Sequence, residues 1–277
     1  MHDSTKRTEI EKPDKGRLLG AVAVIPAVDM GLFFVIPFIA LLWRAFTLEG
    51  TLTTGDISLL SAVSISLGTT AVSVVLIVLL GTPLAYFMAR HHFPFKRLLM
   101  VLVELPIVMP PVVAGLALLS AFGRRGLIGG FLSDIGVTIP FTMAAVVMAQ
   151  VFVSSPFYIR AAQAHFESLP REYEEAAKVD GANRWVIFSQ VMLPQSAQAL
   201  LTGLILSWAR ALGEFGATIL FAGNLQGRTQ TMPLLVYSAM ERDLRVTFIT
   251  ALILLGLAIL AFSLTRWLAG VDKDQDE

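Results

Sequence analysis

Cysteine is absent from the 277 residues of this sequence, which excludes disulfides, thiolate metal sites and cysteine nucleophiles. Charged residues are scarce as well, since they make up 15% of the chain against about 25% in soluble domains. The 21 basic and 21 acidic residues cancel, so no excess positive charge indicates a nucleic-acid partner. Hydrophobic residues reach 55%, with a mean hydropathy of +0.71. This balance predicts a chain that lies largely in lipid.

Several motifs of nucleotide binding and catalysis are also missing. No G-x-x-x-x-G-K-[ST] occurs, so we expect no P-loop ATP site, and no G-x-S-x-G supplies a nucleophilic serine. The four histidines form no H-E-x-x-H, so a metal site is not expected; they are His2, His91, His92 and His165. We therefore predict that this chain is not an enzyme and binds no cofactor of its own.

Six stretches are long and apolar enough to be membrane-spanning helices, which need about 20 largely apolar residues to cross about 30 Å of hydrocarbon. They are residues 18–43, 58–89, 98–122, 141–159, 196–222 and 246–268. The first run has 26 residues and is longer than the apolar part of a signal peptide, which has about 7–15. We predict an all-α integral membrane protein with six transmembrane helices, the first of them retained.

The distribution of Lys and Arg predicts how these helices are oriented. An even number of spans puts both termini on the same side of the membrane. The tails and connections on that side contain 14 Lys and Arg residues, and the connections on the other side contain six. The positive-inside rule then places both termini in the cytoplasm. The predicted organisation is a polar cytoplasmic tail over 1–17, a six-span domain over 18–268 with a cytoplasmic loop at 160–195, and an acidic cytoplasmic tail over 269–277. The expected location is the cell membrane.

The loop between the fourth and fifth stretches has the residues of two short helices. Ser168 can cap a helix that carries Pro170 in its first turn. Gly181 suits the left-handed position that follows such a helix. Asn183 can then begin a second short helix, and Pro194 lies at the entry to the fifth span.

The first of these two helices is expected to be amphipathic. One face holds small or apolar side chains, namely Leu169, Tyr173, Ala176 and Ala177. The opposite face is charged, with Glu174 and Lys178 expected to pair at i,i+4; it consists of Arg171, Glu174, Glu175 and Lys178. Because this face has small residues and lacks the large apolar side chains that interfacial helices use, it is a poor membrane anchor. It favours instead the close approach of another protein.

Motif spacing in this loop carries the main functional signal. Glu175-Ala176-Ala177 is followed after three residues by Gly181, and after nine more by Val191-Met192-Leu193-Pro194. This spacing resembles the EAA loop of ABC importer permeases, E-A-A, three residues, G, nine residues, I-x-L-P, with Val191 as the one departure. The resemblance implies a coupling helix that docks into a cleft of a separate ATP-binding subunit and transmits its motion to the membrane helices. The residues it implicates are Glu174, Glu175, Ala176, Ala177, Gly181, Val191, Leu193 and Pro194. The alternative is a plain amphipathic connector.

Four further blocks resemble the same superfamily. Residues 81–90 end the second stretch, and residues 105–115 in the third include three prolines, which break helical hydrogen bonding. Residues 209–224 and 227–237 resemble the oxyanion branch, which handles molybdate, tungstate and sulfate or thiosulfate. The R-T-Q-T-x-P-L sequence that begins at Arg228 is closer to the molybdate permeases than to the sulfate ones.

Charges inside the apolar stretches need partners, because an isolated charge at mid-bilayer costs about 2.5–3.5 kcal/mol. Arg210 and Glu214 lie four residues apart in the fifth stretch, which places them on one helix face. We favour a structural ion pair that holds helices together; the alternative is that Arg210 supplies positive potential along an anion's pathway. Glu104 is expected to pair with the basic loop at 90–97.

The resemblance also implies partners. A type I importer of this kind would be a homodimer of this chain with two copies of a cytoplasmic ABC ATPase, which hold ATP and Mg, and an extracytoplasmic oxyanion-binding protein. A heterodimer with a related permease is the alternative. An ATP-independent secondary transporter would show broken helices in matching halves, and a membrane-embedded enzyme would show clustered His, Asp or Glu. The sequence shows neither pattern.

Overall fold

The computed structural model describes residues 15–47 and 55–271, and all regular structure in these two ranges is helical. The elements are α1 (Lys15–Thr47), α2 (Gly55–Arg90), α3 (Lys96–Val108), α4 (Pro111–Phe122), α5 (Gly129–Asp134), α6 (Met143–Ser168), α7 (Glu172–Val179), α8 (Arg184–Val186), the π-helical turn η1 (Ile187–Met192), α9 (Leu193–Leu212), α10 (Gly216–Phe221), α11 (Met232–Ala239) and α12 (Leu244–Val271). The chain divides into two compact units, Met1–Glu49 and Gly50–Glu277.

The first unit contains α1, a helix of 33 residues that includes the predicted span 18–43. The polar tail predicted over 1–17 falls outside the described residues except for 15–17, which belong to α1. The acidic tail predicted over 269–277 likewise falls outside them except for 269–271, which end α12.

Four helices of the described part are long and apolar enough to cross a membrane. They cover Pro26–Thr47, Ser58–Arg90, Met143–Ser168 and Leu244–Trp267, and they correspond to the first, second, fourth and sixth predicted spans. The third and fifth predicted spans are each divided into two helices. The all-helical membrane fold is therefore confirmed, and the count of six spans stays a prediction.

The third predicted span is not one continuous helix, because two prolines interrupt it. Met109 is extended (φ −68°, ψ 135°), as expected for a residue that precedes a proline. Pro110 is the N-cap of α4. Its carbonyl accepts hydrogen bonds from the N–H groups of Val113 and Ala114. Residues 98–122 are therefore α3 and α4 with a sharp bend between them.

The fifth predicted span, residues 196–222, also ends earlier than expected. α9 stops at Leu212, and Gly213 follows as its cap. The carboxylate of Glu214 accepts a hydrogen bond from the N–H of Ala217 at 2.8 Å, at the start of the short helix α10. A Cβ built on Gly216 would lie 2.6 Å from the Cβ of Pro111, so a glycine is needed where α10 crosses α4.

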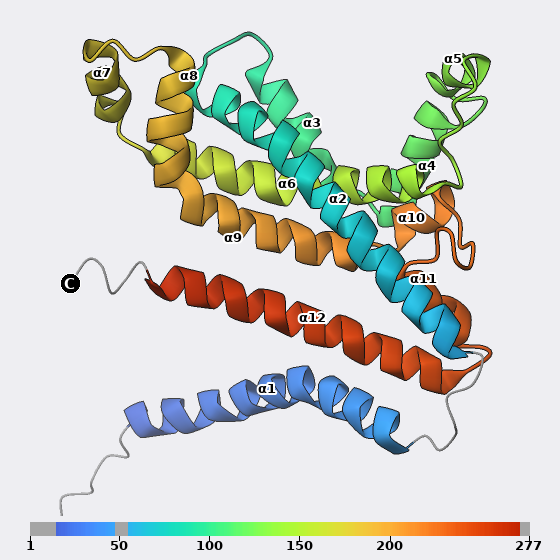
Figure 1. The fold of residues 1–277 in the computed structure, drawn as a ribbon. Coiled ribbons are helices and arrows are strands. Elements are labelled where there is room, and N and C mark those ends of the chain that lie inside the picture. Colours follow the sequence, from blue (N-terminus) through green and yellow to red (C-terminus); the bar gives the residue numbers. More distant parts are fainter. Residues whose placement is uncertain (1–14, 48–54, 272–277) are drawn as a thin grey trace, which may run out of the picture. The chain divides into compact units, whose positions relative to one another are not determined.

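In the second unit, α2, α6 and α9 pack along one another (Figure 1). One cluster of buried side chains joins the last turns of α2 to α6 and η1, and it includes Met88, Tyr158, Phe166 and Met192. A second lies where α4 and α10 meet α6, and a third joins α2, α9, α11 and α12. In Figure 1, α7 and α8 lie at one end of these packed helices and α4, α5 and α10 at the other.

Candidate functional site

The loop that contains the motif begins later than the sequence predicts. α6 continues to Ser168, nine residues beyond the predicted end of the fourth span at Ile159. The Ser168 hydroxyl donates to the carbonyl of His165 in the same helix, so the predicted Ser168 cap is wrong. Leu169, which precedes Pro170, is extended, because the proline ring disfavours a helical residue before it. α7 then begins at Glu172.

The second half of the loop agrees with the prediction. Gly181 has φ +81°, a left-handed conformation that costs glycine little. The side chain of Asn183 accepts a hydrogen bond from the N–H of Val186 at 2.9 Å and so caps α8. Leu193 and Pro194 begin α9. The motif residues therefore divide between α7 and the η1–α9 junction.

None of the eight side chains of α7, all of them described, is fully buried. Ala177 faces the rest of the unit and packs against the cluster around Phe166. Tyr173 and Val179 are 47% and 88% exposed, and Ala176 is exposed as well. The apolar face expected from the sequence is thus divided: Ala177 contacts the core, whereas the other apolar side chains of α7 remain accessible.

Glu174 pairs with Arg90, the last residue of α2, and not with Lys178 as the sequence predicts. The Arg90 Nε lies 2.6 Å from the Glu174 Oε1, and the two side chains are 8% and 14% exposed. A pair at i,i+4 on a helix surface contributes only about 0.3–0.5 kcal/mol. A buried guanidinium without a partner costs far more, so the pairing with Arg90 prevails.

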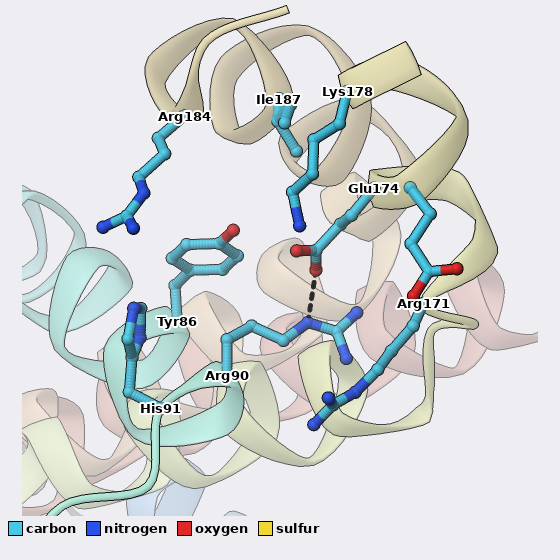
Figure 2. Close-up of a pocket in the computed structure, with 9 residues that line it drawn as sticks. Tyr86, Arg90, His91, Arg171, Glu174, Lys178, Arg184 and Ile187 are labelled. Carbon is cyan, nitrogen blue, oxygen red and sulfur yellow. Dashed lines mark ion pairs between the residues drawn. The ribbon is translucent and has the colours of Figure 1, made fainter.

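A pocket of about 260 Å³ surrounds this ion pair (Figure 2). Its lining joins the end of α2 to both helices of the loop and consists of Tyr86, Arg90, His91, Arg171, Glu174, Glu175, Lys178, Arg184 and Ile187. A separate apolar groove, with a volume of about 390 Å³, includes Leu193 and Pro194. The two parts of the motif thus line different surfaces.

Arg210 and Glu214 form the ion pair that the sequence predicts. The Arg210 Nη1 lies 3.0 Å from the Glu214 Oε2, and the side chains are 29% and 1% exposed. The second carboxylate oxygen accepts from the N–H of Ala217. Glu214 therefore connects α9 to α10, and a role of Arg210 in an anion pathway stays a prediction.

Glu104 has a different partner from the one expected. It pairs with Arg160 of α6 at 3.4 Å and not with the basic loop at 90–97. From that loop Lys96 pairs with Glu167 at 3.7 Å. Both contacts join α3 to α6, and Glu167 lies in the part of α6 beyond the predicted span.

A buried polar face of α2 was not foreseen from the sequence. Ser66, Thr69, Thr70 and Ser73 are each no more than 3% exposed, and they meet Gln150 of α6 and the start of α11. The Ser66 hydroxyl accepts from the N–H of Met232 at 2.7 Å. Their spacing at i, i+3, i+4 and i+7 places these serines and threonines on one helix face. This spacing could have predicted the polar face from the sequence.

The fold is shared with chains of solved ABC transporters. A chain of the bacterial alginate ABC transporter, crystallised in complex with an alginate pentasaccharide-bound periplasmic protein, shares the fold with a TM-score of 0.70, 18% identity and coverage of 92% of this chain and 93% of that chain. A chain of the inward-facing MetNI methionine ABC transporter matches with a TM-score of 0.58 at 18% identity, over 77% of this chain and 95% of that chain.

The chain belongs to the family described as the binding-protein-dependent transport system inner membrane component, whose model matches residues 81–270. The molybdenum transport system permease protein ModB of Mycobacterium tuberculosis is 39% identical, over 84% of this chain and 91% of that protein. The probable transport system permease protein NifC of Clostridium pasteurianum is 38% identical over 75% and 73%. The sulfate transport system permease protein CysW of Synechococcus elongatus is 37% identical over 88% and 87%.

Proposed function

We propose that this chain is the permease subunit of an ATP-driven importer of molybdate or tungstate, with α7 as the helix that docks into the ATPase. The main support for the coupling role is that side chains of α7 are exposed. A helix that bears the EAA motif keeps Tyr173, Ala176 and Val179 accessible, and accessible apolar side chains on a short helix suit a protein partner. The substrate rests on the likeness to the ModB permeases.

The proposed topology has six spans, with both termini and α7 on the cytoplasmic side. In this arrangement α3 and α4 cross the membrane together, and so do α9 and α10. Bends at prolines and glycines are tolerated within a membrane where neighbouring helices cover the freed backbone groups. The packing of α4 against α10 supplies such cover. The greater number of basic residues on the side of α7 supports the orientation.

The proposed transport cycle is alternating access. Each chain carries one coupling helix, and two ATPase subunits need two, which supports a homodimer. An extracytoplasmic oxyanion-binding protein delivers the substrate, and the ATPases hold ATP and Mg. When the ATPases close, they move both copies of α7, and the membrane helices pass from inward-facing to outward-facing. This chain contributes no ATP site or cofactor to that cycle.

Sulfate or thiosulfate is the second candidate substrate. The likeness to CysW, at 37% identity over 88% of this chain, is close to that of the ModB permeases. Tetrahedral dianions of the same charge require similar hydrogen-bond donors along a pathway. The R-T-Q-T-x-P-L sequence from Arg228 supports molybdate.

The decisive experiment is reconstitution of the chain in liposomes with its cognate ATPase and binding protein. Molybdate, tungstate and sulfate are supplied in turn, and ATP hydrolysis and oxyanion uptake are measured. Stimulation by molybdate and tungstate but not by sulfate supports the proposal. Stimulation by sulfate alone would keep the mechanism and overturn the substrate. An ATPase that neither assembles with the chain nor responds to any oxyanion would overturn the coupling role.

A further inference from the structure

Residues 81–90 resemble the permease superfamily, and Arg90 is the last of them. The proposed docking of α7 gives this block no role. We propose that Arg90 is the positioning residue that ties α7 to the membrane helix α2, so that displacement of α7 by the ATPase moves α2 with it. This inference rests on the proposed coupling role of α7. It assigns a specific side chain to the step between docking and the movement of the membrane helices.

The guanidinium of Arg90 holds the segment leading into α7 at two points. Its Nε lies 2.6 Å from the carboxylate of Glu174, and its Nη2 donates to the carbonyl of Leu169 at 3.0 Å. Leu169 is the cap of α6 and Glu174 lies in the first turn of α7. One guanidinium therefore makes an ion pair with α7 and a hydrogen bond to the end of α6, two contacts that the compact ammonium of a lysine does not make at once. Figure 2 shows the ion pair inside its pocket.

The remaining attachments of α7 are weak. Among the described residues, Ala177 is the member of α7 that packs against the core cluster, and α7 has no fully buried side chain. Non-helical segments flank it, at 169–171 before and at 180–183 after. α7 also contacts η1, but the ion pair from Arg90 is what joins it to α2.

The last turns of α2 are in turn firmly held. Tyr86, one turn before Arg90, contacts the rings of Phe166 at 5.5 Å and Phe188 at 4.9 Å. From there α2 continues as one helix of 36 residues, about 54 Å at about 1.5 Å per residue, and packs against α6, α9, α11 and α12. α2 remains helical past Pro83, so a displacement applied at Arg90 acts on the same helix that packs against α9, α11 and α12.

The first test compares Arg90→Gln and Glu174→Gln with wild type in the reconstituted importer. Glu172→Gln is the matched control, because Glu172 is exposed on α7 and forms no ion pair among the described residues. We expect both variants to bind the ATPase in the wild-type ratio and to hydrolyse ATP, but to transport several-fold less oxyanion per ATP. Arg90→Lys keeps the charge but reaches one acceptor only, so its transport per ATP should be intermediate. Breaking the buried pair from one side is expected to lower the yield of folded complex in either case, so oxyanion transport per ATP is measured on the folded complex. A purely structural role would leave that ratio unchanged.

The second test needs no ATPase. The chain has no cysteine, so spin labels at Val179→Cys on α7 and Leu79→Cys on α2, both exposed, report the distance between the two helices directly. We expect a narrow distance distribution in the otherwise wild-type chain and a broad one with Arg90→Gln. An unchanged distribution, or wild-type transport per ATP in Arg90→Gln, would overturn the role of Arg90. A wild-type chain that does not bind the ATPase would overturn the proposed function instead.

Discussion

The hydroxyl of Ser73 in α2 donates to the side-chain carbonyl of Gln150 in α6 at 2.9 Å, and both residues are buried. The amide of the same Gln150 donates to Thr69 at 3.2 Å, one turn earlier in α2. Ser154 and Ser207 extend these contacts to α9, where the Ser207 hydroxyl donates to the Ser154 carbonyl at 2.9 Å. Water is absent from the bilayer core, so such groups must satisfy one another. These contacts hold the three central helices in register.

Ser73→Ala should destabilise the folded chain, because it leaves the Gln150 carbonyl without this donor. Interhelical hydrogen bonds in membrane proteins contribute about 0.6 kcal/mol and at most about 1.7 kcal/mol, and we expect a loss in that range. Reversible unfolding in detergent micelles measures it. Ser64→Ala is the matched control, since the exposed Ser64 hydroxyl bonds the Ser61 carbonyl of its own helix and no other helix among the described residues. Equal losses from the two substitutions would contradict the interhelical role.

Gly115→Ala should destabilise the crossing of α4 and α10. A Cβ at Gly115 would lie 2.8 Å from the carbonyl oxygen of Ala217 and 2.9 Å from its Cα, and backbone atoms cannot move aside as a flexible side chain can. We expect a cost of about 1–3 kcal/mol, the usual range for an overpacked core, measured as a lower midpoint of thermal unfolding.

Gly68→Ala is the control for this substitution within the same unit. No atom of the described residues lies within 4 Å of a Cβ built at Gly68 in α2. Alanine is the better helix former by about 1 kcal/mol, so the midpoint should stay or rise. A fall equal to that of Gly115→Ala would show that the close approach of α4 and α10 is not the cause.

Arg210→Gln should be more damaging than Glu214→Gln. It leaves a carboxylate that is 1% exposed without its cation, whereas the arginine is 29% exposed and can be solvated in part. Breaking a buried pair from one side costs about 3–5 kcal/mol, and the yield of folded protein in detergent should fall accordingly.

The double variant Arg210→Gln/Glu214→Gln distinguishes the two interpretations of this pair. It leaves no unpaired charge, and the glutamine carbonyl can still accept from Ala217, so folding should recover. Uptake of oxyanion per ATP by the recovered protein is then the informative measurement. Wild-type uptake supports a structural ion pair, and a folded chain that no longer transports supports a role of Arg210 in the anion pathway.

Glu175→Arg should uncouple the importer without unfolding this chain. Glu175 is exposed on α7, and surface substitutions usually change stability by no more than about 0.5 kcal/mol. We expect unchanged thermal unfolding together with loss of oxyanion-stimulated ATP hydrolysis. Glu172→Arg reverses the same charge on the same helix outside the motif and should retain that stimulation. Loss of folded protein in Glu175→Arg would refute the placement of Glu175 on an exposed polar face of α7.

Features set by short-range chemistry were predictable from the sequence. The apolar stretches give the helices, Gly181 takes the left-handed conformation after α7, and Asn183 caps α8. The pairing of Arg210 with Glu214 follows from their spacing on one helix. Each of these depends on residues at most four positions apart, so the tertiary environment had little to change.

The sequence could not show which of several possible partners a side chain has. Glu174 has Lys178 one turn away, yet it pairs with Arg90, which is 84 residues distant. Glu104 likewise pairs with Arg160 of the neighbouring helix α6 and not with the basic loop close to it in the sequence. The prolines at 110 and 111 predicted weakened helical bonding, but the sequence did not show whether they would kink the third stretch or divide it, as they do between α3 and α4.

The sequence by itself therefore determined that this chain is a helical membrane protein, that it has apolar stretches, four of which form long helices, and that its loop bears the motif of an importer permease. Hydropathy and motif spacing are properties of the linear chain. Only the tertiary structure decided that α7 keeps apolar side chains accessible, that Arg90 connects it to α2, and that buried polar side chains join α2, α6 and α9. These features arise from contacts between distant segments, where burial makes an unpaired polar group costly and so selects among the partners that the fold brings within reach.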